Sequence, residues 1–408
     1  MATPAPPLPP AKAPWLNRDV VGIGLASLFS DWAHETATTV LPAFLTVLGA
    51  TAWLGLIEGV ADGLSSFAKM GSGFYTDRLP RRKPIAVAGY LITALGTASF
   101  GLATAAWHVL LGRSLAWLGR GVRTPVRKAL LAAAVTPDTY GRAFGFERML
   151  DTLGAIIGPA TGLLLLTALA HNYRQLFFLT LIPGLLAAAV IAFLVREQER
   201  KRVSHASFTE RLQSLPPRYR RFLLAVGCFG AGDFAPALLI LLAMQKLTPE
   251  LGAARAATFG AGLYLLRNVF NAACAPLAGW LADHFDKRRV LSAGYTLAAG
   301  MALLIILAPV NIGTLGLIFA LAGIFVAIVD TLEDSFCAEL VGEEHHGTAF
   351  GVLATVNGLG DFLSSTVVGG LWTAFGTAAA FGYSAVLFMA GAILILRARS
   401  MAVQPDNG

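Results

Sequence analysis

The sequence predicts an all-α membrane protein in which twelve transmembrane helices form two pseudo-symmetric six-helix bundles. Of the 408 residues, 56% are hydrophobic and only 13% are charged, whereas soluble domains carry roughly 25% charged residues. The apolar residues lie in serial runs of about 20, the length of a helix that crosses a hydrocarbon layer. A motif that returns at a fixed spacing indicates two copies of one ancestral half. These observations disfavour a large soluble helical protein.

The repeat is carried by three matches at one spacing. The offset of 206 residues (279 − 73) relates segment 73–83 to 279–289, segment 141–145 to 347–351, and Gly154 to Gly360. Short basic loops fall on the same side of the membrane in both copies. The two halves are therefore predicted to be parallel repeats.

The apolar runs set the predicted elements in chain order. They give the spans 20–48, 53–76, 83–106, 108–131, 141–170, 174–196, 219–246, 252–282, 288–309, 312–340, 346–374 and 377–398. The bundles are expected at 19–196 and 219–398, and the charged segment 197–218 is expected to join them as a cytoplasmic linker. Residues 1–18 and 399–408 are expected to be disordered cytoplasmic tails, and the Pro- and Ala-rich start does not resemble a signal peptide.

Lys and Arg residues predict the orientation. One side of the membrane carries most of them, among them Arg78, Arg81, Arg82, Lys83, Arg142, Arg196, Lys287, Arg288 and Arg289, and the other side carries Arg174, Lys246 and Arg255. The positive-inside rule places the first side and both termini in the cytoplasm. A multi-pass protein of the cell (inner) membrane is expected. The net charge of +7 then needs no nucleic-acid partner.

The first span carries a polar face. Ser27, Asp31, His34, Glu35 and Thr38 share one side of the helix, and Asp31 lies about 16 Å inside the span at the helical rise. An acid at that depth costs about 2.5–3.5 kcal/mol on insertion scales. One interpretation is a proton-coupling site formed by Asp31, His34 and Glu35. The alternative is a static ion pair between the first and fourth helices.

Segment 73–83 resembles the loop signature of the major facilitator superfamily, Gly-x-x-x-Asp-Arg-x-Gly-Arg-Arg-Lys, with Pro80 in place of one glycine. The resemblance covers the whole chain, with twelve spans, two halves and the signature repeated. It implies a transporter in which this loop is a hinge and latch, whose Asp lies near the start of a helix in the other half and is favoured by the helix dipole. Asp77 is expected near the start of the eleventh helix, and Asp283 near the start of the fifth.

The residues assigned to gating are Gly73, Asp77, Arg78, Arg82, Gly279, Asp283, Arg288, Asp330, Asp334 and Arg127. A plain positive-inside loop would explain the arginines but not the fixed Gly and Asp.

The fourth span adds basic residues at membrane depth. Arg113 resembles the family's helix-four arginine, which implies a part in proton coupling. Two glycines and Pro125 around Arg120 and Arg123 predict a loosened helix. In the family, helices one, four, seven and ten line a central cavity, and the residues assigned to it here are Arg120, Arg123, Asp62, Asp233, Arg267, Asn268 and Asp361. If side chains at the same depth in the membrane pair with each other, Asp31 pairs with Arg120 and Glu35 with Arg113.

The fifth span contains Gly154, Gly158, Pro159 and Gly162. Glycines four apart allow close helix packing, and Pro159 is expected to kink the helix. The added Gly-Pro resembles the family signature of exporters that exchange substrate for protons. Close packing alone is the alternative.

Two charge pairings remain as hypotheses. The tenth span ends with the acidic segment 330–334, which is opposite the basic end of the fourth span in the repeat. The first hypothesis is that Asp334 pairs with Arg127 across the cytoplasmic mouth. For Arg127 and Lys128 alone, snorkelling to the interface is the preferred interpretation. Arg267 is expected to pair with Glu147 or Asp151 rather than to bind an anion.

The function that these features favour is proton-coupled export of a small polar or charged organic molecule by alternating access. The alternatives are a proton-coupled importer of an anionic metabolite, with Arg113, Arg120 and Arg267 as ligands, and a non-transporting membrane receptor. The chain lacks a Gly-x-x-x-x-Gly-Lys-Ser/Thr loop, so ATP is not the expected energy source. No enzyme activity, metal or cofactor is expected, and the partners are the substrate, protons and the lipid bilayer around a monomer.

Overall fold

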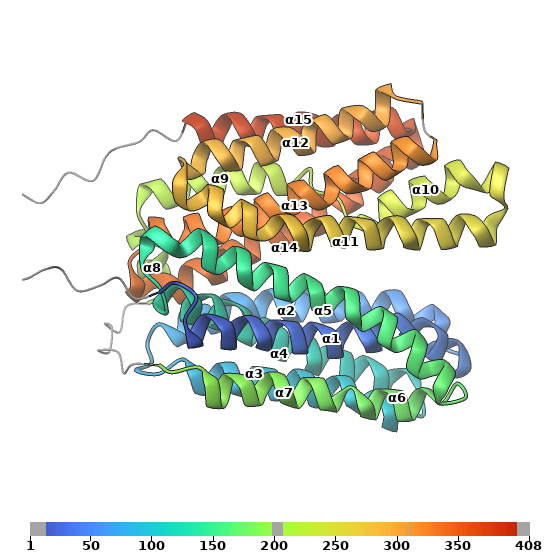
Figure 1. Cartoon of the computed structure of the whole chain (residues 1–408), viewed down its shortest axis with the longest axis horizontal. Coiled ribbons are helices and arrows are strands. Elements are labelled where there is room, and N and C mark those ends of the chain that lie inside the picture. The colour runs from blue at the N-terminus through green and yellow to red at the C-terminus, as the bar shows by residue number, and fades with distance from the viewer. Residues whose placement is uncertain (1–13, 198–206, 310, 398–408) are drawn as a thin grey trace, which may run out of the picture.

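The computed structural model describes residues 14–197, 207–309 and 311–397, so most of the predicted N-terminal tail, the whole C-terminal tail and residues 198–206 of the linker lie outside the described residues. It is built from helices in two bundles that lie side by side (Figure 1). The helices of the first bundle are α1 (Arg18–Val47), η1 (Thr51–Trp53), α2 (Leu54–Thr76), α3 (Lys83–Ala98), η2 (Ser99–Leu102), α4 (Ala106–Ala133), η3 (Pro137–Thr139), α5 (Tyr140–Ala168), α6 (Tyr173–Leu179) and α7 (Leu181–Leu194).

The second bundle repeats this plan. Its helices are α9 (Pro217–Gly230), α10 (Pro236–Leu251), α11 (Ala253–His284), α12 (Lys287–Leu307), α13 (Ile312–Leu340), η4 (Glu343–His345), α14 (His346–Phe375) and α15 (Thr377–Arg397), and α8 (Phe208–Ser214) lies in the linker. Each half supplies six spans. The sixth span is divided between α6 and α7, and the seventh between α9 and α10. The predicted fold of two six-helix bundles is confirmed.

The membrane-crossing helices differ in how apolar they are. Seven segments are long and apolar enough to be candidate spans by composition: 83–102, 137–168, 173–194, 287–307, 312–340, 343–375 and 377–397. The remaining spans, formed by α1, α2, α4, α9–α10 and α11, carry ionisable side chains at membrane depth or are interrupted. Since such side chains are costly in lipid, they are expected to face protein or water.

Local sequence explains where several helices begin. The Asn17 side chain accepts from the backbone N–H groups of Asp19 and Val20 at the start of α1. Asp286 caps α12 through the N–H of Arg288, and Asn311 forms a capping box with Thr314 at the start of α13. These side chains satisfy N–H groups that a helix start leaves without a partner.

The seventh span is interrupted between α9 and α10, over residues 231–235. Pro236 starts α10 and has no backbone N–H, which makes a continuous helix through this position unfavourable. The freed backbone groups are satisfied by other helices. Ser364 of α14 donates to the carbonyl of Asp233, and Tyr383 of α15 donates to the carbonyl of Ala231 (3.0 Å). Irregular backbone at this depth is tolerated only where protein or water surrounds it.

Each half has its own aromatic core. In the second, the ring of Phe229 stacks on Tyr295 with centroids 4.0 Å apart and on Phe388 at 4.7 Å. In the first, Phe177 packs edge-on against Phe44 and Phe100 at 5.1 and 5.4 Å. The outward-facing side chains remain apolar, as a lipid environment requires, because Phe193 of α7 and Leu307 of α12 are 76% and 78% exposed.

The linker helix α8 lies against the loop that follows α2. Ser207 and Glu210 form its capping box. The hydrogen bond from the backbone N–H of Ser207 is the largest cause of the lowered pKa of the Glu210 carboxyl, and the bond with the Ser207 side chain is the second. Phe208 packs edge-on against Phe74 with centroids 5.2 Å apart. Arg211 is buried, and its Nη1 lies 3.9 Å from a carboxylate oxygen of Asp77. The linker therefore contacts the first gating loop directly.

A pseudo-twofold axis runs between the halves. Tyr140 and His346 occupy equivalent positions of the repeat, and their rings lie 6.3 Å apart. Phe144 and Phe350 are also equivalent, and their rings lie 5.7 Å apart. Two equivalent residues can touch each other only near the symmetry axis. Both pairs lie near the end of the molecule that carries the basic loops and both described chain termini, which we call the basic end.

Candidate functional site

A compact cluster of ion pairs joins α1, α4 and α5 inside the first half. Arg127 Nη1 lies 3.0 Å from Glu147 Oε1 and 3.2 Å from Asp151 Oδ1. The same guanidinium donates to the hydroxyl of Ser27, which donates to Glu147 at 2.6 Å. Arg127 is 7% exposed, so the interpretation that it snorkels to the interface is wrong. Buried charges persist when partners and hydrogen bonds offset their desolvation.

Asp31 of α1 completes the cluster. Its Oδ1 lies 3.2 Å from Arg120 Nη1 and 3.8 Å from Arg123 Nη2. The guanidinium of Arg123 also lies over the ring of Tyr90 of α3, 4.3 Å from the ring centroid, which is within the roughly 6 Å reach of a cation–π contact. The structure thus brings together Asp31 and Arg120 as their depths predict.

The second depth-matched pair is wrong. Arg113 does not reach Glu35, because its Nη2 binds Glu58 of α2 at 2.8 Å and its Nη1 donates to Thr38 at 3.0 Å. Glu35 has the imidazole of His34 as its ion-pair partner within the described residues, at 3.9 Å. Depth along a helix fixes the height of a side chain but not the direction in which it points.

Trp117 of α4 organises the polar groups around these residues. Its ring lies 4.2 Å from the ring of His34 and 4.2 Å beneath the guanidinium of Arg113. Its indole N–H donates to the carboxylate of Asp62 of α2. The predicted cavity residue Asp62 is therefore held by the first half.

α4 is a continuous α-helix from Ala106 to Ala133, so the predicted loosening around Arg120 is wrong. Its glycines serve close packing instead. A Cβ on Gly119 would meet the carbonyl of Gly89 of α3 at 2.7 Å, and one on Gly121 would meet the carbonyl of Ser65 of α2 at 2.6 Å. The glycines let α4 lie between α2 and α3 with little space between the backbones.

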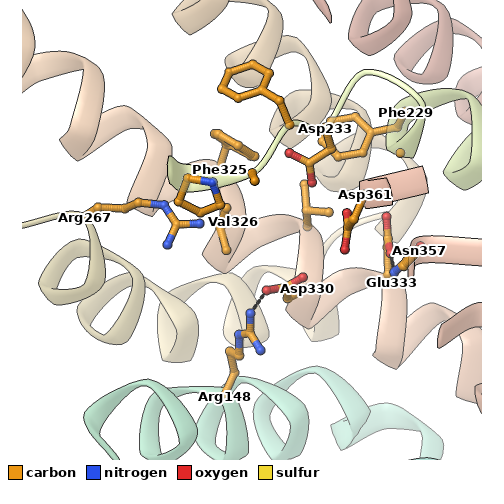
Figure 2. A pocket seen from close by; sticks show the side chains of 15 residues that line it. Arg148, Phe229, Asp233, Arg267, Phe325, Val326, Asp330, Glu333, Asn357 and Asp361 are labelled. Carbon is orange, nitrogen blue, oxygen red and sulfur yellow. Dashed lines mark hydrogen bonds and ion pairs between the residues drawn. The ribbon is translucent and has the colours of Figure 1, made fainter. Parts of the chain in front are cut away.

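A cavity of about 310 Å³ lies at the boundary between the two halves (Figure 2). Charged and polar side chains line it together with aromatic and aliphatic ones: Arg148, Phe229, Asp233, Phe234, Arg267, Phe325, Val326, Val329, Asp330, Glu333, Asn357 and Asp361. By the helical rise, these charged residues lie roughly 10 to 25 Å from the basic ends of their helices. A concave site with a few convergent polar groups is the usual form of a small-molecule site.

Arg148 is the first half's contribution to this cavity. Its guanidinium binds Asp330 of α13 across the boundary, as the dashed line in Figure 2 shows. It also lies 3.5 Å from Asp151 of its own helix. One arginine thus links the charge cluster of the first half to the cavity wall of the second, a role that the sequence did not reveal.

Glu333 is fully satisfied by its own half. It accepts from the phenol of Tyr295 at 2.7 Å and from the amide of Asn357 at 2.8 Å. By contrast, the carboxylates of Asp233 and Asp361 have no hydrogen-bond or ion-pair partner within the described ranges 14–197, 207–309 and 311–397.

Arg267 does not pair with Glu147 or Asp151, so that prediction is wrong. Those two acids bind Arg127, and Arg267 Nη1 donates to the amide oxygen of buried Asn268 at 3.2 Å. Its guanidinium also lies 5.9 Å from the ring of Tyr264. Within the part of the chain described here, Arg267 has no carboxylate partner at hydrogen-bond distance.

The predicted gating loop meets the second half at the start of α14. Asp77 accepts from the backbone N–H groups of Gly347 (2.9 Å) and Thr348 (2.6 Å) and from the Thr348 hydroxyl (2.8 Å). Arg82 is buried and binds the same carboxylate, and it donates to the carbonyl of Glu343 at 3.3 Å. A Cβ on Gly73 would overlap the carbonyl of Gly347. Backbone N–H groups at a helix start are a favourable site for a carboxylate.

The second copy makes the equivalent contact with the start of α5. Asp283 accepts from the N–H groups of Gly141 (2.6 Å) and Arg142 (3.0 Å), and Arg142 Nε adds a bond of 2.9 Å. Gly279 approaches Gly141 as closely as Gly73 approaches Gly347. The other arginines assigned to gating lie elsewhere: Arg288 binds Asp286, and Arg78 stacks on Phe74 with 4.1 Å to the ring centroid.

The charge pair across the basic end differs from the predicted one. Asp334 of α13 binds Lys128 Nζ at 2.6 Å, whereas Arg127, its predicted partner, points into the first half. Lys128 is therefore not a snorkelling side chain. Lys128 and Asp334 are separated by 206 residues, which makes them equivalent positions of the repeat. That equivalence was the signal that could have identified the pair.

The glycines of the proposed exporter motif lie along α1. A Cβ on Gly154 would overlap the carbonyl of Leu28, and a Cβ on Gly158 would meet Glu35 Cβ at 2.6 Å. Gly162 faces Thr36, whose hydroxyl donates to the carbonyl of Gly158 at 3.1 Å. Pro159 lies inside α5, which remains one helix from Tyr140 to Ala168. The motif thus places α5 directly on the helix that carries Asp31 and Glu35.

Among the described residues there is no group of three or more His, Cys, Asp or Glu side chains that could hold a metal ion. His346, the first residue of α14, is buried, and its Nε2 lies 3.0 Å from the carbonyl of Ala338. It therefore has a structural contact within its own half.

The fold and this geometry define a class of protein: a multi-pass membrane protein whose two six-helix halves meet around a charged cavity. A family model described as Major Facilitator Superfamily matches residues 23–248 and again 222–407. The chain belongs to this superfamily of transporters, as its repeated loop signature indicates.

Relatives and solved structures agree with this assignment. An uncharacterized MFS-type transporter of Methanocaldococcus jannaschii is 28% identical over 382 residues, which cover 93% of this chain and 95% of the relative. The multidrug resistance protein MdtH of Escherichia coli is 27% identical over 246 residues, 59% of each chain. In structure, the chain resembles the human organic anion transporter MFSD10 (TM-score 0.77, 16% identity, 94% and 100% covered) and the E. coli fucose:proton symporter FucP (TM-score 0.76, 19% identity, 94% and 99% covered).

Proposed function

We propose that this transporter exports a small polar or charged organic molecule in exchange for protons by alternating access. The observation that carries the proposal is the cavity between the halves, whose wall includes Asp233 and Asp361, two carboxylates that form no ion pair within the described part of the chain. A carboxylate without a guanidinium partner can exchange a proton for a substrate group without breaking an ion pair. Glu35 in the first half has the same property.

The orientation in this proposal follows the positive-inside rule, so the basic end faces the cytoplasm of the cell (inner) membrane. Among the described residues, the hydrogen bonds and ion pairs between the two halves join residues in the basic half of the molecule. This arrangement corresponds to a closed cytoplasmic mouth. Exchange of substrate would then require the Asp77 and Asp283 contacts and the Lys128–Asp334 pair to separate.

Three features support export over import. Two of the three arginines that an anion importer would use as ligands, Arg113 and Arg120, are already bound to Glu58 and Asp31. The glycines of α5 follow the pattern that resembles proton-exchanging exporters. A relative that aligns with 59% of this chain, at 27% identity, is a multidrug resistance protein.

The test uses everted membrane vesicles whose interior is acidified by respiration, with a pH-sensitive dye as the reporter. Amines, amino acids, organic acids and cationic dyes are added one at a time. Under the proposal, at least one compound class dissipates the pH gradient in vesicles that contain the transporter. The same compounds leave the gradient intact in vesicles from cells that lack the transporter. A compound that enters only right-side-out vesicles, driven by external acid, would instead establish the importer.

A further inference from the structure

The charged groups of the cavity fall into satisfied and unsatisfied sets. Arg148 and Asp330 bind each other, and Glu333 is held by Tyr295 and Asn357. Three charged residues of the lining form no ion pair within 4 Å among the described residues: Asp233, Asp361 and Arg267. These three are the charges that the protein itself leaves for a ligand.

The unsatisfied charges are separated by sign. In Figure 2, the Asp233 and Asp361 side chains lie near each other on one side of the cavity, and Arg267 reaches in from the other side. The Arg148–Asp330 pair lies between the two regions and is neutral as a unit. The cavity therefore offers one acidic and one basic region rather than a uniform field.

The backbone around Asp233 adds to the acidic region. α9 ends at Gly230, one turn before Asp233, and the C-terminal end of a helix carries partial negative charge. Three rings also line the cavity, those of Phe229, Phe234 and Phe325, and aromatic faces attract cations. The position of Asp233 is fixed, because Ser364 binds its carbonyl and the Ser365 hydroxyl accepts from the N–H of Ala235 at 3.0 Å.

The basic region is fixed in the same way. Arg267 is held by Asn268, which is 5% exposed, and Asn271, one turn further along α11, is 3% exposed. The neutral amide of Asn268 orients the guanidinium without neutralising its charge. The other guanidinium nitrogens can then bind a carboxylate or phosphate in two-pronged geometry.

We propose that the cavity binds a zwitterion, with its ammonium group between Asp233 and Asp361 and its anionic group on Arg267. This inference rests on the proposed transport function, for which it names the substrate class. A simple cation would leave Arg267 unpaired, and a simple anion would leave both carboxylates unpaired. Binding a zwitterion satisfies both regions at once.

The test is isothermal titration calorimetry on the purified full chain in detergent. The probes are ω-amino acids of increasing chain length, each compared with the alkylamine and the alkanoate of the same length. At the length that fits, the ω-amino acid is expected to bind about tenfold more tightly than either analogue, since a tenfold change is about 1.4 kcal/mol. Equal affinity for the amine and the amino acid at every length, or heat from none of the probes, overturns the proposal.

Variants assign the two ends of the ligand. Arg267→Gln should reduce the affinity for the amino acid to that for the amine and leave amine binding unchanged. Asp233→Asn or Asp361→Asn should weaken the amine and the amino acid together. Arg255→Gln, an exposed position on the same helix, is the matched control and should change nothing. If Arg267→Gln weakens the amine equally, the assignment of the basic region is wrong.

Binding and transport can fail separately. Calorimetry requires no proton gradient, so a zwitterion that binds but never releases the acid gradient of everted vesicles would contradict proton-coupled export alone. If cations or anions dissipate that gradient and no zwitterion binds, the result would contradict the ligand assignment alone. The selectivity of the unmodified protein decides the proposal even if a variant fails to fold.

Discussion

Asp31 and Glu35 lie one turn apart on α1, but the structure gives them different chemistry. Asp31 is bound by Arg120 at 3.2 Å and lies 3.8 Å from Arg123. Among the described residues, the ion-pair partner of Glu35 within 4 Å is the ring of His34, at 3.9 Å, and the Glu35 side chain is 31% exposed. An acid held by two guanidinium groups must give up ion pairs to bind a proton, whereas Glu35 need not. Glu35 is therefore the better candidate of the two for proton coupling.

We predict that Glu35→Gln removes proton coupling while the protein folds normally. Asp31→Asn is expected instead to reduce folding stability by about 3–5 kcal/mol, because it leaves buried arginines without their partner. The measurements are thermal melting in detergent and gradient-driven flux in proteoliposomes. If Asp31→Asn melts normally and loses only coupling, the roles of the two acids are reversed.

At the scale of helices, the glycines explain how closely α1 and α5 pack. The backbone of Leu28 and Trp32 occupies the space where Gly154 would carry a Cβ. Because the blocking atoms belong to backbone, they cannot move aside as a flexible side chain would. A substitution must therefore push the two helices apart and displace Asp31 and Glu35 with them.

We predict that Gly154→Ala lowers stability by about 1–3 kcal/mol, the usual cost of overpacking, and also slows transport. Gly300→Ala is the matched control, since Gly300 lies on the outer helix α12 with nothing within 4 Å of a built Cβ. Thermal melting and flux of both variants are the measurements. Equal melting temperatures would show that α1 and α5 can separate without cost.

At the scale of the whole molecule, the contacts at the basic end follow the internal symmetry. Asp77 binds the start of α14, and Asp283 binds the start of α5. Between these two contacts lies the pair Lys128–Asp334, formed by equivalent residues of opposite charge. The pair closes the boundary near the axis, where a small separation of the halves must break it.

We predict that Lys128→Asp and Asp334→Lys each reduce proton-coupled flux by about tenfold, equivalent to about 1.4 kcal/mol, because each places like charges in contact. The double variant Lys128→Asp/Asp334→Lys should recover most of the flux. Flux in proteoliposomes at equal protein density is the measurement.

The control for this charge exchange is Arg127→Asp combined with Asp334→Arg, which should not recover flux. Arg127 belongs to the cluster with Glu147 and Asp151 and does not face Asp334. Recovery in this second double variant, and not in the first, would mean that Arg127 is the functional partner of Asp334.

The sequence predicts the fold and the gating contacts because both depend on patterns along the chain. Span length and the repeated Gly and Asp are visible without knowing how the helices are rotated. The partners of Arg113, Arg127 and Arg267 were mispredicted for the opposite reason. Helical rise gives the depth of a side chain, but the direction in which it points is set by packing, such as the glycine contacts of α4.

The interruption of the seventh span also escaped prediction. Gly232 and Pro236 are local signals for a break, but the apolar run around residues 231–235 is long enough for one helix, and the prediction treats 219–246 as a single span. The path of residues 231–235 depends on side chains far along the chain, Ser364, Ser365 and Tyr383, which take over the backbone hydrogen bonds. A local pattern contains no information about partners more than a hundred residues away.

The Lys128–Asp334 pair bears on the ancestry of the chain. In a dimer of identical six-helix subunits, a residue on the axis meets its own copy, so a lysine there would face a lysine and an aspartate an aspartate. Complementary charges at one site became possible only when two gene copies could mutate independently. Each present-day half is consequently shaped to recognise the other and to reject a duplicate of itself.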